Sequence, residues 1–193
     1  AENLISAELP GPTRELADEL RDGVRRASHL ANQLLEMART EGASHQQRRI
    51  IDLTALATSL LADFYALAES RNVQLAMIAD ASCTIEGDRE AIRKLVGILV
   101  DNAIRYSEPG CSVELRIVSA GDACAVEVVD EGIGIPEDVL PLIYDRFFRA
   151  APPGIEGTGL GLAIAKTTAD RHGLGLTHQN RDGTRGTIAR VEF

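Results

Sequence analysis

The stretch that most constrains the fold runs from residue 88 to 106, where apolar residues recur every three or four positions. The apolar set is Ile92, Leu95, Val96, Leu99 and Ala103. This spacing predicts a helix that packs on a core. A neighbouring face of the same helix carries Ile98, Asn102, Arg105 and Tyr106. Polar groups of this kind on one side of an otherwise apolar helix indicate a wall of a binding site.

Composition and charge exclude several classes of protein. Hydrophobic residues make up 45% of the 193 residues, which is enough for a core, but aromatic residues make up only 4%. The net charge of −9 and the absence of a Lys/Arg tract argue against a nucleic-acid partner. The longest apolar run, residues 95–100, is far too short to span a membrane. Three widely spaced cysteines fit no metal or disulfide pattern, which favours a reducing compartment.

Periodicity predicts an α+β sandwich from residue 50 onward. We expect helices at 52–69, 88–106 and 158–172, a short helical piece at 143–149, and strands at 73–78, 83–86, 112–119, 123–130, 174–179 and 187–193. Strands that turn back on their neighbours favour a mixed, largely antiparallel sheet, and the helices are expected to cover one face of it.

The first forty residues have a different pattern. After Pro10-Gly11-Pro12, a long helix is expected from Thr13 to about Thr40, with apolar residues at alternating spacings of three and four. This seam suits a helical bundle, and an ordinary amphipathic helix packed on its own domain is equally compatible with it. The polar residues 42–49 lack periodicity and are expected to form a linker.

The segment DEGIGIP, residues 130–136, leaves a predicted strand and turns sharply. Two glycines two positions apart, Gly132 and Gly134, allow the backbone to approach a ligand closely. A carboxylate at the strand end, Asp130, can accept a hydrogen bond from an exocyclic amine such as that of adenine. The same residues are also typical of an ordinary turn next to an acidic residue.

The segment GTGLGL, residues 157–162, opens a predicted helix. Backbone N–H groups at such a start, together with the helix dipole, favour an anion. A dinucleotide fingerprint requires a third glycine where this chain has Leu162, and a P-loop requires Gly-Lys-Ser/Thr, which is absent. Glycines that serve only helix packing are the structural alternative.

Taken together and in this order, the motifs resemble the Bergerat ATP-binding fold of histidine kinases, DNA gyrase, MutL and the ninety-kilodalton chaperones. DNAIRYS looks like the kinases' N box, DEGIGIPED their G1 box, IYDRFFR their F box and GTGLGLAIAK their G2 box. The resemblance implies an ATP-binding catalytic domain at residues 50–193, a linker at 42–49, and a partial dimerisation and phosphoacceptor segment at 1–41 whose first helix is truncated.

The resemblance also implies roles for individual residues. Asn102 would ligate Mg²⁺ through its amide oxygen, and Arg105 would reach phosphate, which makes these two the expected catalytic residues. Asp130 would select adenine. The expected nucleotide-binding residues are Asn102, Arg105, Tyr106, Asp130, Gly132, Gly134, Ile135, Phe148, Arg149, Gly157, Thr158, Gly159, Leu160, Gly161, Leu162 and Thr187. Phe147 is the alternative to Phe148 as the residue that anchors the loop over the phosphates.

Two features depart from the family pattern. None of the four histidines, His29, His45, His172 and His178, lies in the family's phosphoacceptor motif, so we expect the acceptor upstream of Ala1. Ile98 stands where related kinases have Asn, one helical turn before Asn102, and where hydrolysing relatives have Glu. An Ile side chain can neither ligate a metal nor transfer a proton.

Three functional hypotheses follow. The leading one is the catalytic region of a sensor histidine kinase, which uses ATP and Mg²⁺ to phosphorylate a histidine and supplies a response-regulator receiver domain. The parent would be a homodimer, anchored in the inner membrane with this region in the cytoplasm. The second is an ATPase of the gyrase, MutL or chaperone type, against which Ile98 counts. The third is a degenerate kinase that binds ATP or ADP with weak magnesium-dependent turnover.

Overall fold

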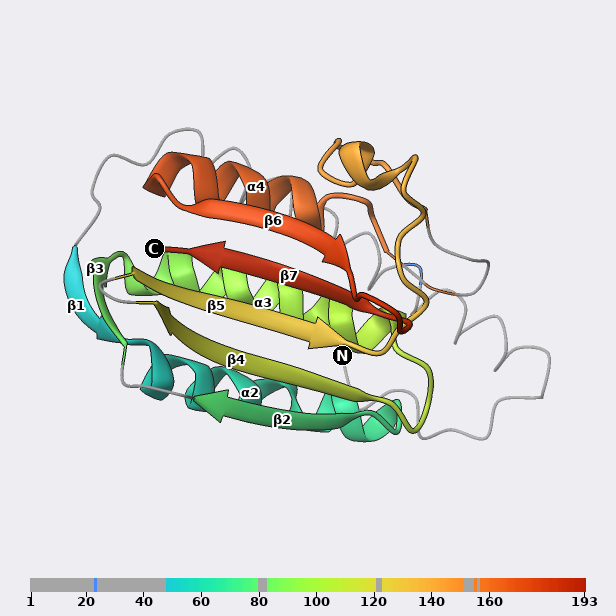
Figure 1. The fold of residues 1–193 in the computed structure, drawn as a ribbon, viewed down its shortest axis with the longest axis horizontal. Helices are drawn as coiled ribbons and strands as arrows, with labels where there is room; N and C mark the ends of the chain where they lie inside the picture. The colour runs from blue at the N-terminus through green and yellow to red at the C-terminus, as the bar shows by residue number, and fades with distance from the viewer. Residues whose placement is uncertain (1–22, 24–47, 80–82, 121–122, 151–154, 156) are drawn as a thin grey trace, which may run out of the picture. The chain divides into compact units, whose positions relative to one another are not determined.

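The computed structural model describes residue 23 and residues 48–79, 83–120, 123–150, 155 and 157–193 (Figure 1). Apart from residue 23, these belong to one compact unit, Ala43–Phe193. Its helices are α2 (Leu53–Ser70), α3 (Arg89–Tyr106), the 3₁₀ turn η2 (Leu140–Leu142) and α4 (Gly161–His172). Its strands are β1 (Arg49–Asp52), β2 (Gln74–Ala79), β3 (Thr84–Gly87), β4 (Ser112–Ala120), β5 (Ala123–Asp130), β6 (Gly175–Asn180) and β7 (Thr187–Glu192).

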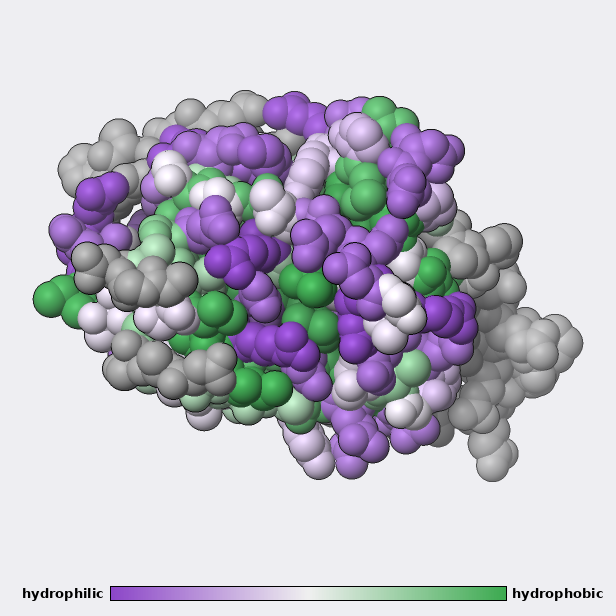
Figure 2. Space-filling model, viewed as in Figure 1, coloured by the Kyte–Doolittle hydropathy of each residue, from purple (hydrophilic) through white to green (hydrophobic). Residues whose placement is uncertain are grey.

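Five strands form the main sheet, in the order β2-β4-β5-β7-β6. The β2–β4 pair is parallel, and the other three pairs are antiparallel. Helices α2, α3 and α4 lie together behind the sheet in Figure 1. The opposite face carries charged pairs such as Arg190 with Glu127 and Glu192, and Figure 2 shows hydrophilic side chains gathered across it with apolar patches between them. The layers therefore place one hydrophobic core between the helices and the sheet.

Helix α3 lies at the centre of that core. All five residues of its predicted apolar stripe are at most 5% exposed. Asp88 begins the helix as its N-cap, because its Oδ1 accepts hydrogen bonds from the N–H groups of Glu90 and Ala91 at 3.0 and 3.1 Å. A helix buried along its length and capped in this way holds its last turn firmly against the ends of the central strands.

The α+β sandwich with helices on one face is confirmed, and most predicted elements lie within a few residues of their observed bounds. The helical piece expected at 143–149 is wrong. Phe147 has a left-handed φ of 66°, which a helix does not tolerate, and its N–H donates to the Gly159 carbonyl instead.

The structure also adds an element. β1 pairs with β3 in a separate two-stranded sheet, so the strand begins at Arg49, inside the expected linker. Of the helix expected at 13–40, only residue 23 lies within the described residues, and the rest lies outside them. None of the described helices combines the length and the apolar character that crossing a membrane requires.

A buried aromatic contact connects the segment after η2 to strand β6. The Tyr144 hydroxyl lies 2.8 Å from Nδ1 of His178, and the two rings meet edge to face with centroids 5.5 Å apart. Burial lowers the pKa of His178 to about 4 and raises the pKa of Tyr144 to about 12. The imidazole is therefore neutral at pH 7, and its tautomer decides whether Nδ1 accepts the hydrogen bond from the hydroxyl or donates it.

This contact predicts a specific pH dependence of stability. Because the folded-state pKa of His178 lies below its ordinary value of 6.5, the unfolded chain binds the extra proton first. The stabilisation is fully present above pH 6.5 and is lost as the pH falls toward 4, by about 2 kcal/mol at pH 5. Urea unfolding of the His178→Gln variant should show a smaller loss between pH 7 and 5 than the wild type. His172→Gln is the control, and an equal loss in wild type and His178→Gln would contradict the prediction.

Candidate nucleotide-binding site

The predicted site begins at Asp130, the last residue of β5. Its side chain is buried, with 5% of the residue exposed. Oδ1 accepts hydrogen bonds from the N–H groups of Gly132 at 2.8 Å and Thr187 at 3.1 Å, and Oδ2 accepts one from the Thr187 hydroxyl. The carboxylate thus joins β5, the 130–136 turn and the start of β7. A carboxylate has about four acceptor positions, so Oδ2 retains capacity for another donor.

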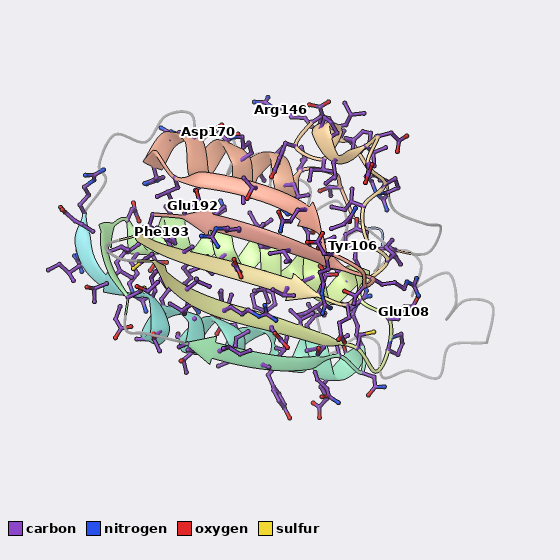
Figure 3. All side chains as sticks on the ribbon, in the orientation of Figure 1. Tyr106, Glu108, Arg146, Asp170, Glu192 and Phe193 are labelled. Atoms are coloured by element: carbon purple, nitrogen blue, oxygen red, sulfur yellow. The ribbon has the colours of Figure 1, made fainter. Side chains whose placement is uncertain are left out.

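The 130–136 turn contacts the end of α3. The N–H of Ile133 donates to the carbonyl of Tyr106 at 3.4 Å. A Cβ atom at Gly132 would lie 2.5 Å from that same carbonyl oxygen, which real side chains do not tolerate. Only glycine therefore allows the turn to lie this close to the helix. Figure 3 shows Tyr106 at this end of the sheet, far from Glu192 and Phe193 at the other.

One face of α3 connects both glycine motifs. Ile98, Asn102 and Tyr106 are spaced four apart and so lie in line along the helix. Tyr106 contacts the 130–136 turn, as described above. At the other end of the line, a Cβ on Gly161 would lie 3.5 Å from Cγ2 of Ile98, in ordinary van der Waals contact. Asn102 lies between these two contacts and is partly exposed.

The second glycine motif closes a loop and opens a helix. Gly159 has a φ of 72°, and its carbonyl accepts the Phe147 N–H at 2.9 Å, so the two ends of the loop meet there. Helix α4 begins at Gly161, and its N-cap residue, Leu160, makes no side-chain capping bond within the described residues. The first N–H groups of a helix have no partner within it. Those of α4 are consequently suited to an anion.

Two predicted arginines have protein partners. Nε of Arg105 donates to Oδ2 of Asp101, one turn earlier on α3, at 2.6 Å. Arg149 donates to the carbonyl of Ile155. Phe148 is partly buried, whereas Phe147 is 61% exposed. Asp101 was not among the predicted residues, although its spacing from Arg105 is typical of a helical ion pair.

The structure therefore brings the predicted residues together in two groups. The first surrounds the turn and consists of Tyr106, Asp130, Gly132, Gly134, Ile135 and Thr187. The second consists of the segment Gly157–Leu162 with Phe147 and Phe148. α3 contacts both groups and carries Asn102 between them. Which of these residues touch a nucleotide stays a prediction.

A cavity of about 370 Å³ lies between the turn and the β6–β7 hairpin. It is lined by Ile133, Gly134, Ile135, Pro136, Asn180, Thr184, Arg185 and Gly186. Only Gly134 and Ile135 among these were predicted as site residues. Ile133 and Pro136 belong to the DEGIGIP motif, and for the four hairpin residues the sequence carries no signal beyond the polar and glycine residues of an ordinary turn.

Glu131, the second residue of the turn, also accepts a hydrogen bond from a backbone N–H group. The N–H of Ser112 donates to Oε2 of Glu131 at 2.9 Å and, as the largest cause, lowers the pKa of that carboxyl. Arg181 lies 3.8 Å from the other oxygen and acts in the same direction. Ser112 and Arg181 therefore stabilise the charged form of the Glu131 carboxyl.

Comparison with known proteins gives consistent results. Residues 87–193 match the family described as histidine kinase-, DNA gyrase B-, and HSP90-like ATPase. The chain is 33% identical to the sensor histidine kinase YkoH of Bacillus subtilis over 97% of its own length and 41% of that protein. It is 30% identical to the sensor histidine kinase CusS of Escherichia coli O157:H7, over 93% of its own length and 39% of that protein.

Solved structures agree with the sequence matches. The mycobacterial sensor histidine kinase MprB superimposes with a TM-score of 0.66 at 26% identity, covering 76% of this chain and 96% of that one. The predicted resemblance to the catalytic region of sensor histidine kinases is confirmed by these relatives. Since the family match covers more than half of its residues, the chain belongs to the family of histidine kinase-, DNA gyrase B- and HSP90-like ATPases.

Proposed function

We propose that this chain is the ATP-binding catalytic region of a sensor histidine kinase, and that the whole protein transfers the γ-phosphoryl group of ATP to a histidine. The chain spans only about two fifths of the two sensor kinases it was compared with, so the phosphotransfer itself belongs to this proposal. The observation that carries the proposal is the buried Asp130 carboxylate, which β5, the turn and β7 hold at the site.

The arrangement suits ATP at both ends. At the turn, Asp130 Oδ2 accepts a hydrogen bond from the adenine amine. Gly132, which has no side chain, keeps the backbone close to α3, so the base can lie against it. At the other end, the uncapped start of α4 supplies N–H donors for phosphate oxygens. Catalysis in such a site consists mainly of holding the reacting groups in position and neutralising charge, because phosphoryl transfer needs little covalent help from the protein.

Magnesium fits the donor set only in part. Asn102 offers one amide oxygen, and hard cations of this kind prefer oxygen ligands. Within the described ranges, no cluster of three or more His, Cys, Asp or Glu side chains could hold a metal. Mg²⁺ would take its remaining ligands from phosphate and water, and it would neutralise the charge of the phosphates. Ile98 adds an apolar contact with α4 where a second amide would add a ligand.

The partners are part of the proposal as well. Sensor kinases act as homodimers and pass their phosphoryl group to the receiver domain of a response regulator, so we propose both for the whole protein. A location in the cytoplasm, beneath a membrane-anchored sensor segment, follows from the same reasoning.

The direct test is phosphohistidine formation. The whole protein, incubated with γ-labelled ATP and Mg²⁺, should acquire an acid-labile, alkali-stable label that then moves to a receiver domain. An absence of label at all metal concentrations, with ADP still bound, would favour a module that only binds nucleotide. Release of free phosphate without any labelled histidine would favour an ATPase of the gyrase or chaperone type.

Removal of the Asp130 charge should weaken nucleotide binding. Asp130→Asn keeps the side chain's size but turns part of it into a donor, which opposes the adenine amine. We expect the Kd for ADP, measured by calorimetry, to rise about tenfold or more, because a hydrogen bond to a charged group contributes about 1.5–3 kcal/mol. Glu127→Gln removes a carboxylate from the same strand on the opposite sheet face and should leave the affinity unchanged. Equal affinities in all three proteins would contradict the assignment of Asp130.

The Ile98 side chain should limit the response to magnesium. Ile98→Asn would place an amide one turn before Asn102 and offer a further oxygen ligand. We expect Mg²⁺ to strengthen ATP binding several-fold more in this variant than in the wild type. Ile98→Val is the matched control, since it changes the apolar side chain by one methyl group without adding an oxygen. If Mg²⁺ has the same effect on all three proteins, Ile98 does not limit metal binding.

A further inference from the structure

Asn180, the last residue of β6, holds the 130–136 turn through both atoms of its side-chain amide. Its Oδ1 accepts the N–H of Ile135 at 2.8 Å, and its Nδ2 donates to the Ile135 carbonyl at 2.6 Å. Because a backbone N–H only donates and a carbonyl only accepts, these two bonds fix the orientation of the amide. The side chain thus pairs with Ile135 as a neighbouring strand would.

The next residue of the hairpin holds the other end of the same turn. Arg181 donates from a guanidinium nitrogen to the Asp130 carbonyl at 3.2 Å, and it lies 3.8 Å from the Glu131 carboxylate. Its own N–H donates to the Gly186 carbonyl at 3.1 Å, which closes the hairpin. The β6–β7 hairpin therefore binds both ends of the turn: Arg181 binds Asp130, and Asn180 binds Ile135.

The hairpin packs closely against only part of the turn: a Cβ on Gly186 would lie 2.0 Å from the Asp130 carbonyl oxygen. Beyond that contact, the cavity of about 370 Å³ lies between the turn and the hairpin, and Ile133 at its wall is 37% exposed. A segment next to empty space is restrained by its hydrogen bonds rather than by close-packed side chains. Asn180, which is half-buried and lines this cavity, supplies the two bonds that cross from β6 to Ile135.

We propose that Asn180 is a positioning residue for the purine, acting through the backbone of Ile135. The inference rests on the proposed function, since it assigns Ile135 to the wall beside the base. Asn180 does not contact the nucleotide itself. It fixes the position of Ile135 relative to Asp130. When its two bonds are lost, the turn moves into the cavity, and the wall beside the base is no longer held in place before the nucleotide binds. Loss of such preorganisation weakens binding without removing any direct contact.

The experiment compares the wild-type chain with Asn180→Ala and with Gln179→Ala, an exposed neighbour on the same strand. Calorimetry measures the Kd for ADP, and amide hydrogen exchange measures the protection of the Ile135 N–H. We expect Asn180→Ala to raise the Kd about five- to tenfold, as the loss of a hydrogen bond predicts. Exchange at Ile135 should accelerate at least as much, while the melting temperature and the exchange of core amides in α3 stay near those of Gln179→Ala.

The outcomes separate this inference from the function it rests on. Failure of the wild type to bind ADP would overturn the proposed function. Wild-type affinity in Asn180→Ala, with ADP bound normally by the other proteins, would overturn the role of Asn180 alone. A uniform loss of protection and of melting temperature would assign Asn180 to general stability and would also overturn it. If Asn180→Ala fails to fold, Asn180→Asp keeps the shape and the accepted bond but replaces the donated bond with a carboxylate oxygen that repels the Ile135 carbonyl, and its ADP affinity should still fall at least threefold.

Discussion

The site depends on a buried carboxylate that joins three segments distant in the chain. Asp130 accepts two backbone N–H groups and the Thr187 hydroxyl, so β5, the turn after it and β7 meet at one side chain. A buried charge is costly unless hydrogen bonds replace the water it loses. Those bonds also restrict the turn to one path. The requirement to satisfy the carboxylate and the requirement to position a recognition group are therefore met by the same contacts.

Helix α3 extends this constraint to the second half of the site. It is buried along its length, and one line of its residues contacts the turn through Tyr106 and the start of α4 through Ile98. A rigid element between the two glycine motifs fixes the distance between them and, in the proposed function, the distance between the base and the phosphates. The apolar side chain of Ile98 faces α4, so in the proposed function Asn102 would be the amide ligand on this face of the helix.

Most of the sandwich was predictable because its signals are local. The stripe on α3 and the alternation along β4 and β5 reflect which side chains are buried, and burial shapes the residue pattern directly. Residues 143–149 were mispredicted because their apolar letters suit a helix, whereas the pairing of Phe147 with Gly159 depends on a contact twelve residues away. The contact of Asn180 with Ile135 spans forty-five residues. Asn is common at the ends of strands, so the presence of an Asn there does not by itself indicate which group its side chain binds.

The two ends of the site differ in how firmly the fold holds them. The end at Asp130 is restrained by α3 on one side and by the β6–β7 hairpin on the other, through bonds from Tyr106, Asn180 and Arg181. The other end, where the phosphates are proposed to bind, relies on the Phe147–Gly159 bond at the base of a loop and on a helix start without a side-chain cap. If the proposed function holds, this division means that the base meets a preformed wall, whereas the phosphates order their own end of the site on binding. Under the same proposal, Ile98 offers the phosphate end no polar group, so a larger share of the nucleotide's affinity would come from the preformed end.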